Sequence, residues 1–307
     1  MVAYLLRRIL WIIPVLFAVS IITFILMHSV PGGPWDREKR LSPGVIARIQ
    51  AKYELDRPLH EQYINWVVDF VNLDLGPSYR YTNRDVNDIV GEGLPTTIHL
   101  GLMAFTLAVG LGIPLGVIGA LGHNRWPDYL ATAVSIIGIS TPSFVLAILL
   151  VVIFSVGLQM FPATSNRWSD WNTWVLPVIA LAGYQIAQIA RYTRASMLEV
   201  TRRDYIRTAH SKGLRARAVV TRHMIRNALI PVITILGPIL AFLVTGSFII
   251  EYFFGVPGIG KFYIEAIGGR DYTVIMAMTV IYAFAVASLN VVVDVLYAYI
   301  DPRIRYS

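Results

Sequence analysis

The sequence of 307 residues contains no cysteine. This absence excludes disulfide bonds, thiolate metal sites and cysteine nucleophiles. Charge is also scarce, at 15% of the residues, whereas a soluble domain carries about 25% to cover its water-facing surface. Hydrophobic residues reach 56%, so the chain has too little polar surface to enclose its apolar mass in water. The composition indicates a membrane protein and excludes a soluble enzyme, a disordered scaffold and a collagen-like fibre.

The net charge of +7 does not indicate a nucleic-acid partner, because the basic residues are not spread over one soluble face. Long apolar runs dominate instead, and a spanning helix needs about 20 such residues. Six segments meet this need and predict an all-α, six-helix membrane domain over 1–307, with the spans at 9–30, 97–121, 129–158, 173–190, 229–252 and 273–300.

The first apolar segment follows Arg7 and Arg8, as in a signal peptide. Its run is longer than the 7–15 residues typical of a signal peptide, and no A-x-A cleavage site follows. We therefore expect it to be retained as a spanning helix.

The distribution of Lys and Arg predicts the orientation. With the N-terminus inside, the inner segments hold fifteen Lys and Arg, ten of them in 191–228, whereas the two short outer loops hold three. The outer segment 31–96 is too long to count in this rule. We expect both termini in the cytoplasm, 31–96 outside the cell membrane and 191–228 inside.

Two helices are expected in 31–96. Ser42 at N-cap and Pro43 at N1 favour a helix that continues to Glu54. Segment 59–73 is amphipathic, with Tyr63, Trp66, Val67 and Phe70 on one face. Two interpretations of this second helix stay open: it lies at the membrane interface, or it caps the translocation path.

The basic segment 191–228 contains a short helix-compatible run at 204–212. Asp204 and Lys212 complement the helix dipole, and Gly213 suits a left-handed residue after the helix. A second helix-like stretch follows at 216–225. One interpretation is a positive anchor on anionic lipid; the other is a helix that a partner protein can push.

Residues 255–261 fit G-x-x-x-x-G-K, the motif of a phosphate-binding loop. Phe262 stands where Ser or Thr would hold magnesium, and no strand of a nucleotide domain precedes the motif. We expect no ATP binding here. A rigid turn at the outer mouth of the pathway is predicted instead, built by Gly255, Pro257, Gly258 and Gly260.

Intramembrane polar residues are candidates for function. Asn290 and Asp294 lie one turn apart in the last span, although Asp294 would also suit a structural pairing with an arginine. An intramembrane aspartyl protease would need a second facing carboxylate, and neither G-x-S-x-G nor H-E-x-x-H occurs. No catalytic residue, metal site or cofactor is expected.

A small-residue stripe, with its members at Gly110, Gly112, Gly116 and Ala120, predicts close helix packing.

Over its whole length the chain resembles the permease subunits of bacterial peptide-importing ABC transporters, most closely the first permease subunit of oligopeptide permeases. The matching segments are 5–8, 31–34, 51–55, 75–78, 255–260, 292–298 and 301–302. The most specific match, from Asp204 to Gly213, resembles the family's EAA loop. Arg207 and Thr208 replace the Glu and Ala of that name, and Ile230-Pro231 follows at a longer interval than in the general consensus.

The resemblance implies a multi-pass permease of the bacterial inner membrane. Such a subunit pairs with a second, homologous permease; two cytoplasmic ATPases bind and hydrolyse ATP, and an extracytoplasmic binding protein delivers peptide. A coupling helix docks on one ATPase, which here implies roles for Asp204, Tyr205, Arg207, Thr208, Ala209 and Gly213. Because of its small side chain, Ala209 is expected at the closest approach to that ATPase.

Oligopeptides are the expected cargo, and the alternatives are dipeptides, glutathione, nickel or a sugar-like solute. Segment 31–96 with Leu75-Gly76-Pro77-Ser78 favours oligopeptides. An ungated structural or assembly protein of the membrane is the alternative outside transport.

Overall fold

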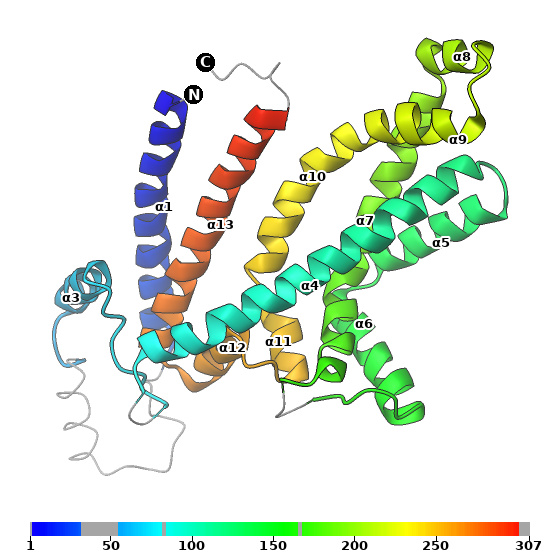
Figure 1. Cartoon of the computed structure of the whole chain (residues 1–307). Helices are drawn as coiled ribbons and strands as arrows, with labels where there is room; N and C mark the ends of the chain where they lie inside the picture. The colour runs from blue at the N-terminus through cyan, green and yellow to red at the C-terminus, as the bar shows by residue number, and fades with distance from the viewer. Residues whose placement is uncertain (1, 32–54, 82–83, 165–167, 301–307) are drawn as a thin grey trace. The chain divides into compact units, whose positions relative to one another are not determined.

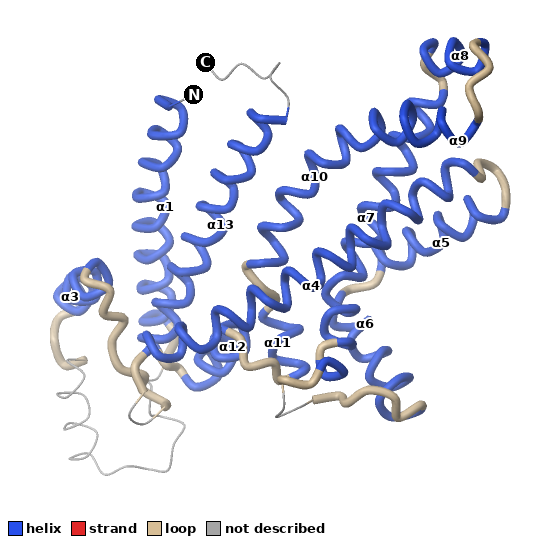
Figure 2. The backbone as a smooth tube through the Cα atoms, in the orientation of Figure 1, coloured by secondary structure: helices blue, strands red, loops and turns tan. Residues whose placement is uncertain are grey.

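The computed structural model describes residues 2–31, 55–81, 84–164 and 168–300, and it contains only helices and loops in these ranges (Figures 1 and 2). The predicted all-α class is confirmed for them. The elements are α1 (Val2–Ser29), α3 (Leu59–Val71), α4 (Val86–Leu121), α5 (Trp126–Ser140), α6 (Ser143–Leu150), η1 (Val151–Gly157), η2 (Trp171–Thr173), α7 (Val175–Thr201), α8 (Asp204–Ser211), α9 (Ala216–Ala218), η3 (Val219–Ile225), α10 (Arg226–Val244), α11 (Phe248–Phe254), α12 (Ile259–Gly269) and α13 (Tyr272–Ile300).

The chain divides into two compact units. The first unit comprises 1–97, 257–291 and 305–307, and the second comprises 98–256 and 292–304. The long helices α4 and α13 contribute residues to both units. Each unit is described by itself below.

Within the described residues, four helical stretches are long and apolar enough to cross a membrane: Leu6–Ser29, Val86–Leu121, Ala216–Val244 and Tyr272–Val295. A fifth candidate is α5 together with α6 and η1, which bend by 108° at a short break. Helix α7 is not among these candidates, and its middle carries Tyr184, Gln185 and Gln188. Six spans therefore remain a prediction.

The predicted third span, 129–158, is not one continuous helix, because α5 ends at Ser140 and α6 begins at Ser143. Proline disfavours helical backbone in the preceding residue and has no N–H of its own. Thr141 is accordingly extended (ψ 116°), and Pro142 serves as the N-cap of α6. The predicted fifth span, 229–252, is also divided: α10 ends at Val244, and α11 begins at Phe248 with the Ser247 hydroxyl accepting from the Ile250 amide.

In the first unit, the predicted amphipathic helix at 59–73 is confirmed as α3. Its apolar face packs on α1: the hydroxyls of Tyr63 and Ser20 are 2.8 Å apart, and the Tyr63 and Phe24 rings are 5.3 Å apart. The helix expected from 43 to 54 lies outside the described residues, as do 32–34 and 301–302 of the matching segments and all but the last residue of 51–55.

Also in the first unit, the loop that carries Leu75-Gly76-Pro77-Ser78 is hydrogen-bonded to the residue before α13. The buried Asp271 carboxylate accepts hydrogen bonds from the Ser78 hydroxyl (2.5 Å) and from the Thr273 hydroxyl (2.9 Å). The Tyr81 hydroxyl donates to Glu265 on α12. Burial and this hydrogen bond raise the pKa of Tyr81 well above its ordinary value.

In the second unit, α7 is the central helix, in contact with α5, α6 and α10. Glycines permit its closest approaches. A Cβ added at Gly112 would lie 2.8 Å from Ile189 Cβ, and one added at Gly116 would lie 2.5 Å from the Ala190 carbonyl oxygen. The predicted small-residue contact is confirmed for these two glycines, whereas Gly110 has nothing within 4 Å of its Cβ position.

Candidate functional site

The predicted helix at 204–212 is confirmed as α8, which follows α7 after two arginines. Arg203 is extended at the N-cap, and Asp204 places a negative charge in the first turn, where the helix dipole favours it. Gly213 has φ +72°. Around it the Leu214 amide donates to the Ala209 carbonyl at 3.3 Å, and the Gly213 amide donates to the His210 carbonyl at 2.9 Å. This pair of bonds is the Schellman motif, so a residue other than glycine at 213 would strain the end of α8.

One face of α8 is buried against the chain itself. Ile206 is 2% exposed and Ala209 is 5% exposed. They join a cluster of apolar side chains from α4, α7, η3 and α10, completed by Ala120, Met197, Val200, Val219, Met224 and Ala228. The helix is therefore packed against the rest of the second unit.

This burial changes the interpretation of Ala209. Its side chain is only 5% exposed and packs in the apolar cluster of this chain. The small side chain allows α8 to pack closely on α7 and η3. That Ala209 also marks the closest approach of an ATPase stays a prediction.

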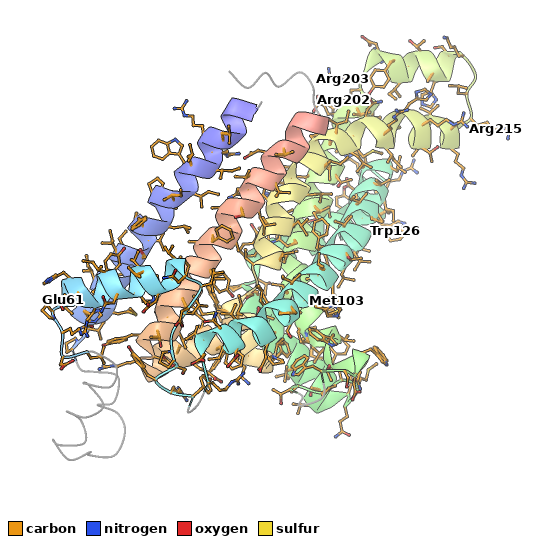
Figure 3. The ribbon with its side chains drawn as sticks, turned by 60° about the vertical axis from the view of Figure 1, so that its left-hand side comes forward. Glu61, Met103, Trp126, Arg202, Arg203 and Arg215 are labelled. Atoms are coloured by element: carbon orange, nitrogen blue, oxygen red, sulfur yellow. The ribbon has the colours of Figure 1, made fainter. Side chains whose placement is uncertain are left out.

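The opposite face of α8 is exposed and carries Tyr205, Arg207 and Thr208. Arg207 lies 3.7 Å from Asp204 in an exposed ion pair, which contributes little to stability. Arg202, Arg203 and Arg215 flank the helix (Figure 3). The exposed face thus offers one aromatic ring, a row of hydrogen-bond donors and positive charge to another molecule.

The helices on which α8 packs, α7 and α10, are joined by a hydrogen bond. The Ser196 hydroxyl on α7 donates to the Ala228 carbonyl on α10 at 2.7 Å. The stretch predicted at 216–225 is helical, but Val219–Ile225 forms a π-helix that runs directly into α10. Such wide turns are rare and concentrate at functional positions.

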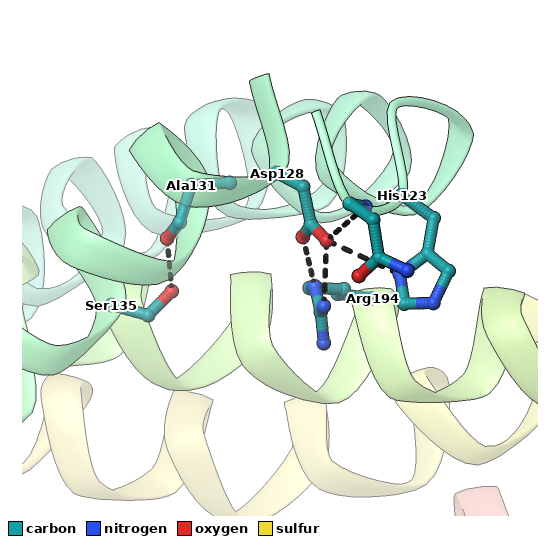
Figure 4. A network of polar contacts seen from close by, with 6 residues as sticks. His123, Asp128, Ala131, Ser135 and Arg194 are labelled. Atoms are coloured by element: carbon teal, nitrogen blue, oxygen red, sulfur yellow. Dashed lines mark hydrogen bonds and ion pairs between the residues drawn. The ribbon is translucent and has the colours of Figure 1, made fainter. Parts of the chain in front are cut away.

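A polar network joins the start of α5 to α7 (Figure 4). Arg194 on α7 donates to both carboxylate oxygens of Asp128, from Nε at 2.5 Å and from Nη2 at 2.9 Å. The Asn124 amide donates to Asp128 Oδ2 at 2.9 Å, and His123 Nδ1 lies 3.2 Å from the same oxygen. The Asp128 side chain is only 4% exposed, so its charge is neutralised within the protein.

The predicted turn at 255–260 connects two helices. Gly255 is left-handed (φ 68°) and ends α11, whereas Gly258 is the N-cap of α12. The Ile259 amide donates to the Thr97 hydroxyl at 3.0 Å, and Gly258 and Gly260 are buried. The G-x-x-x-x-G-K motif therefore follows a helix rather than a strand, and one of its amides already has a protein partner. Pro257 lies between the two glycines that end and begin these helices.

Asn290 and Asp294 lie one helical turn apart on α13, as expected. Asn290 is exposed and Asp294 is half-buried. Gln185 on α7 was not predicted from the sequence, and its side-chain oxygen is buried without a hydrogen-bond partner among the described residues. The available signal was the pair Gln185 and Gln188, spaced to share one face of an otherwise apolar stretch.

Comparison with known proteins shows which proteins the chain resembles. The profile of a family described as binding-protein-dependent transport system inner membrane component matches residues 112–306, and the profile of its N-terminal part matches 1–101. The dipeptide transport system permease protein DppB of Bacillus subtilis is 42% identical over 305 residues, 99% of this chain and 98% of its own. The oligopeptide transport system permease protein OppB of Salmonella typhimurium is 41% identical over 307 residues, 100% of both chains.

Solved structures share the fold. An amino acid ABC transporter crystallised with histidines matches with a TM-score of 0.55 and 18% identity, over 69% of this chain and 94% of its own. The MetNI methionine ABC transporter in inward-facing conformations matches with a TM-score of 0.56 and 17% identity, over 69% and 96%. The fold is thus that of ABC importer permeases, and the two sequence matches together span nearly the whole chain. The chain belongs to the family of inner membrane components of binding-protein-dependent transport systems.

Proposed function

We propose that this chain is a permease subunit that carries oligopeptides across the bacterial inner membrane into the cytoplasm. Its full-length relatives are permeases of peptide transport systems, which supports a peptide cargo. Relatives named for dipeptides and for oligopeptides match at nearly the same identity, so the preference for oligopeptides rests on segment 31–96. In this proposal the chain has six spans, and both of its termini and segment 191–228 lie in the cytoplasm.

The chain works with partners in this proposal. A second, homologous permease completes the path, an extracytoplasmic binding protein delivers peptide, and two cytoplasmic ATPases bind and hydrolyse ATP. The chain itself binds no nucleotide. The G-x-x-x-x-G-K motif lacks the Ser or Thr that would follow it, and its Ile259 amide already donates to the Thr97 hydroxyl, which supports this view.

The observation that carries the proposal is the two-sided character of α8. Its buried face fixes it to α7 and η3, while Tyr205, Arg207 and Thr208 face outward. A partner that moved α8 would therefore move α7 and the start of α10 with it, because packed cores transmit displacement without absorbing it. Closure of the ATPases on ATP would in this way switch the paired permeases between outward and inward access.

Reconstitution tests this function. The chain, its partner permease and both ATPases are placed in liposomes with the binding protein outside and ATP inside, and uptake of a labelled pentapeptide is measured. We expect uptake that requires ATP and the binding protein. If a complex that hydrolyses ATP takes up neither the pentapeptide nor any shorter peptide, a peptide cargo is refuted.

A further inference from the structure

The second unit contains a polar pocket at the break between α5 and α6. It has a volume of about 490 Å³. Its wall is formed by three elements: the break itself, the middle of α7 and the end of α10 with the residue before α11. Tyr184 and Phe242 line it and are exposed, so the pocket opens on the surface of the unit.

The break supplies backbone groups to this pocket. The Thr141 amide still donates to the Ile137 carbonyl at 3.0 Å, but Pro142 has no N–H for the carbonyl of Gly138. The last carbonyls of α5 and the first amides of α6 thus lack partners within their own helices. At membrane depth, such non-helical backbone occurs only where it is buried in protein or lines a water-filled cavity.

The burial of Gln185 is a second, independent observation that points to a ligand in this pocket. The residue is 5% exposed and lines the pocket, and its Oε1 atom has no hydrogen-bond partner in the described part of the chain. A buried polar atom without a partner is costly, so such an atom calls for a ligand or water that satisfies it. A stabilising role within the fold does not account for this side chain.

The remaining polar side chains of the wall are also uncharged. They are the hydroxyls of Ser140, Thr141, Ser143, Tyr184 and Ser247 and the amide of Gln188. Among the described residues, no acidic or basic side chain lines the pocket. A bare metal ion such as nickel would need imidazole or carboxylate ligands, whereas neutral donors and acceptors suit an amide.

We propose that this pocket is a contact site for the passing peptide, in which Gln185 forms a hydrogen bond with a backbone amide group of the cargo. This inference rests on the proposed transport of peptides and adds the residues that contact them. Because every peptide has the same backbone amide, whatever its side chains, the site would accept peptides of many sequences. The side-chain amide of Gln185 offers both a donor and an acceptor, and a peptide unit offers the complementary pair.

Gln185→Leu separates this role from a structural one. Removing a buried polar atom that has no partner should leave the thermal stability of the complex unchanged or raise it. If Gln185 binds cargo, the same change should lower peptide uptake about tenfold, since roughly 1.4 kcal/mol corresponds to a factor of ten. The two roles therefore predict opposite results.

Thr193→Val provides the matched control. Thr193 is on the same helix and is fully buried, and its hydroxyl likewise has no partner among the residues described, but it does not line the pocket. We expect normal uptake from this variant. A double-mutant cycle uses a series of pentapeptides, each methylated on one backbone nitrogen. Methylation at the contacted amide should reduce uptake by wild type. The same methylation should have little further effect on uptake by Gln185→Leu.

Full pentapeptide uptake by Gln185→Leu, alongside uptake by wild type, would overturn the contact site and leave the transport function intact. Equal losses in Gln185→Leu and Thr193→Val would also overturn it, because the effect would then not be specific to the pocket. Failure of wild type to transport any peptide would instead refute the proposed function itself. The outcomes for the site and for the function are thus distinct.

Discussion

The guanidinium of Arg194 and the carboxylate of Asp128 form a two-pronged ion pair, with its shorter contact at 2.5 Å from Nε to Oδ1. Arg194 is on α7, two turns before the end of that helix, and Asp128 lies in the first turn of α5, the helix that ends at the polar pocket. Geometry of this kind is directional as well as strong. The pair therefore connects the helix that carries α8 to the helix that borders the pocket.

Loss of one member of this pair should destabilise the protein. Asp128→Ala would leave Arg194 partly buried without its carboxylate, a change that typically costs about 3 kcal/mol. We expect a clear drop in the unfolding temperature of the detergent-solubilised chain. The control is Glu199→Ala, which removes an exposed pair with Arg203 and should cost about 0.5 kcal/mol or less. Equal effects of the two variants would contradict the buried role of Asp128.

The two faces of α8 should respond differently to substitution. Tyr205→Ser combined with Arg207→Glu changes only exposed side chains, so the chain should fold and insert but lose ATPase association and transport. Ala209→Arg places a charge in the apolar cluster and should lower stability before any partner binds.

The yield of folded chain and co-purification with the ATPases measure these effects. Arg125→Glu, on the expected inner loop between α4 and α5, controls for the added negative charge and should retain association. If Tyr205→Ser with Arg207→Glu kept full association and uptake, α8 would be no more than a positive anchor.

The contact between α4 and α7 predicts a contrast between neighbouring glycines. Gly116→Ala would place its Cβ 2.5 Å from both the Ala190 carbonyl oxygen and Thr193 Cβ. Overpacking of this kind costs about 1–3 kcal/mol. Gly110→Ala meets no atom within 4 Å and should be neutral or stabilising by about 0.5–1 kcal/mol through helix propensity. Thermal unfolding of the two variants checks this, and equal stability would refute the close contact.

Local chemistry was sufficient to predict α8. An acidic start, a basic end and a glycine at 213 are short-range signals, and each is used as predicted. The close contact of Gly112 and Gly116 with α7 could also be predicted from the sequence, because only the smallest residues allow helices to approach so closely. The amphipathic helix α3 followed from its apolar period.

Other features depend on tertiary structure. The apolar run continues through Thr141 and Pro142, so hydropathy alone could not locate the 108° bend. Which face of α8 is buried depends on the positions of Met197 and Met224, which are distant in the sequence from each other. The pocket requires three separated segments to meet, and the pairing of Asp128 with Arg194 joins residues 66 apart.

The central claim places α8 on the cytoplasmic side, where an ATPase can reach it. The cysteine-free chain allows a direct measurement: Ser211→Cys, on the exposed end of α8, is treated with a membrane-impermeant maleimide in intact cells and in inverted vesicles. Asn83→Cys, in the expected outer segment, serves as the opposite control. The account predicts that Ser211→Cys is labelled only in inverted vesicles stripped of the ATPases and is protected when they are bound. Labelling of Ser211→Cys in intact cells would contradict it.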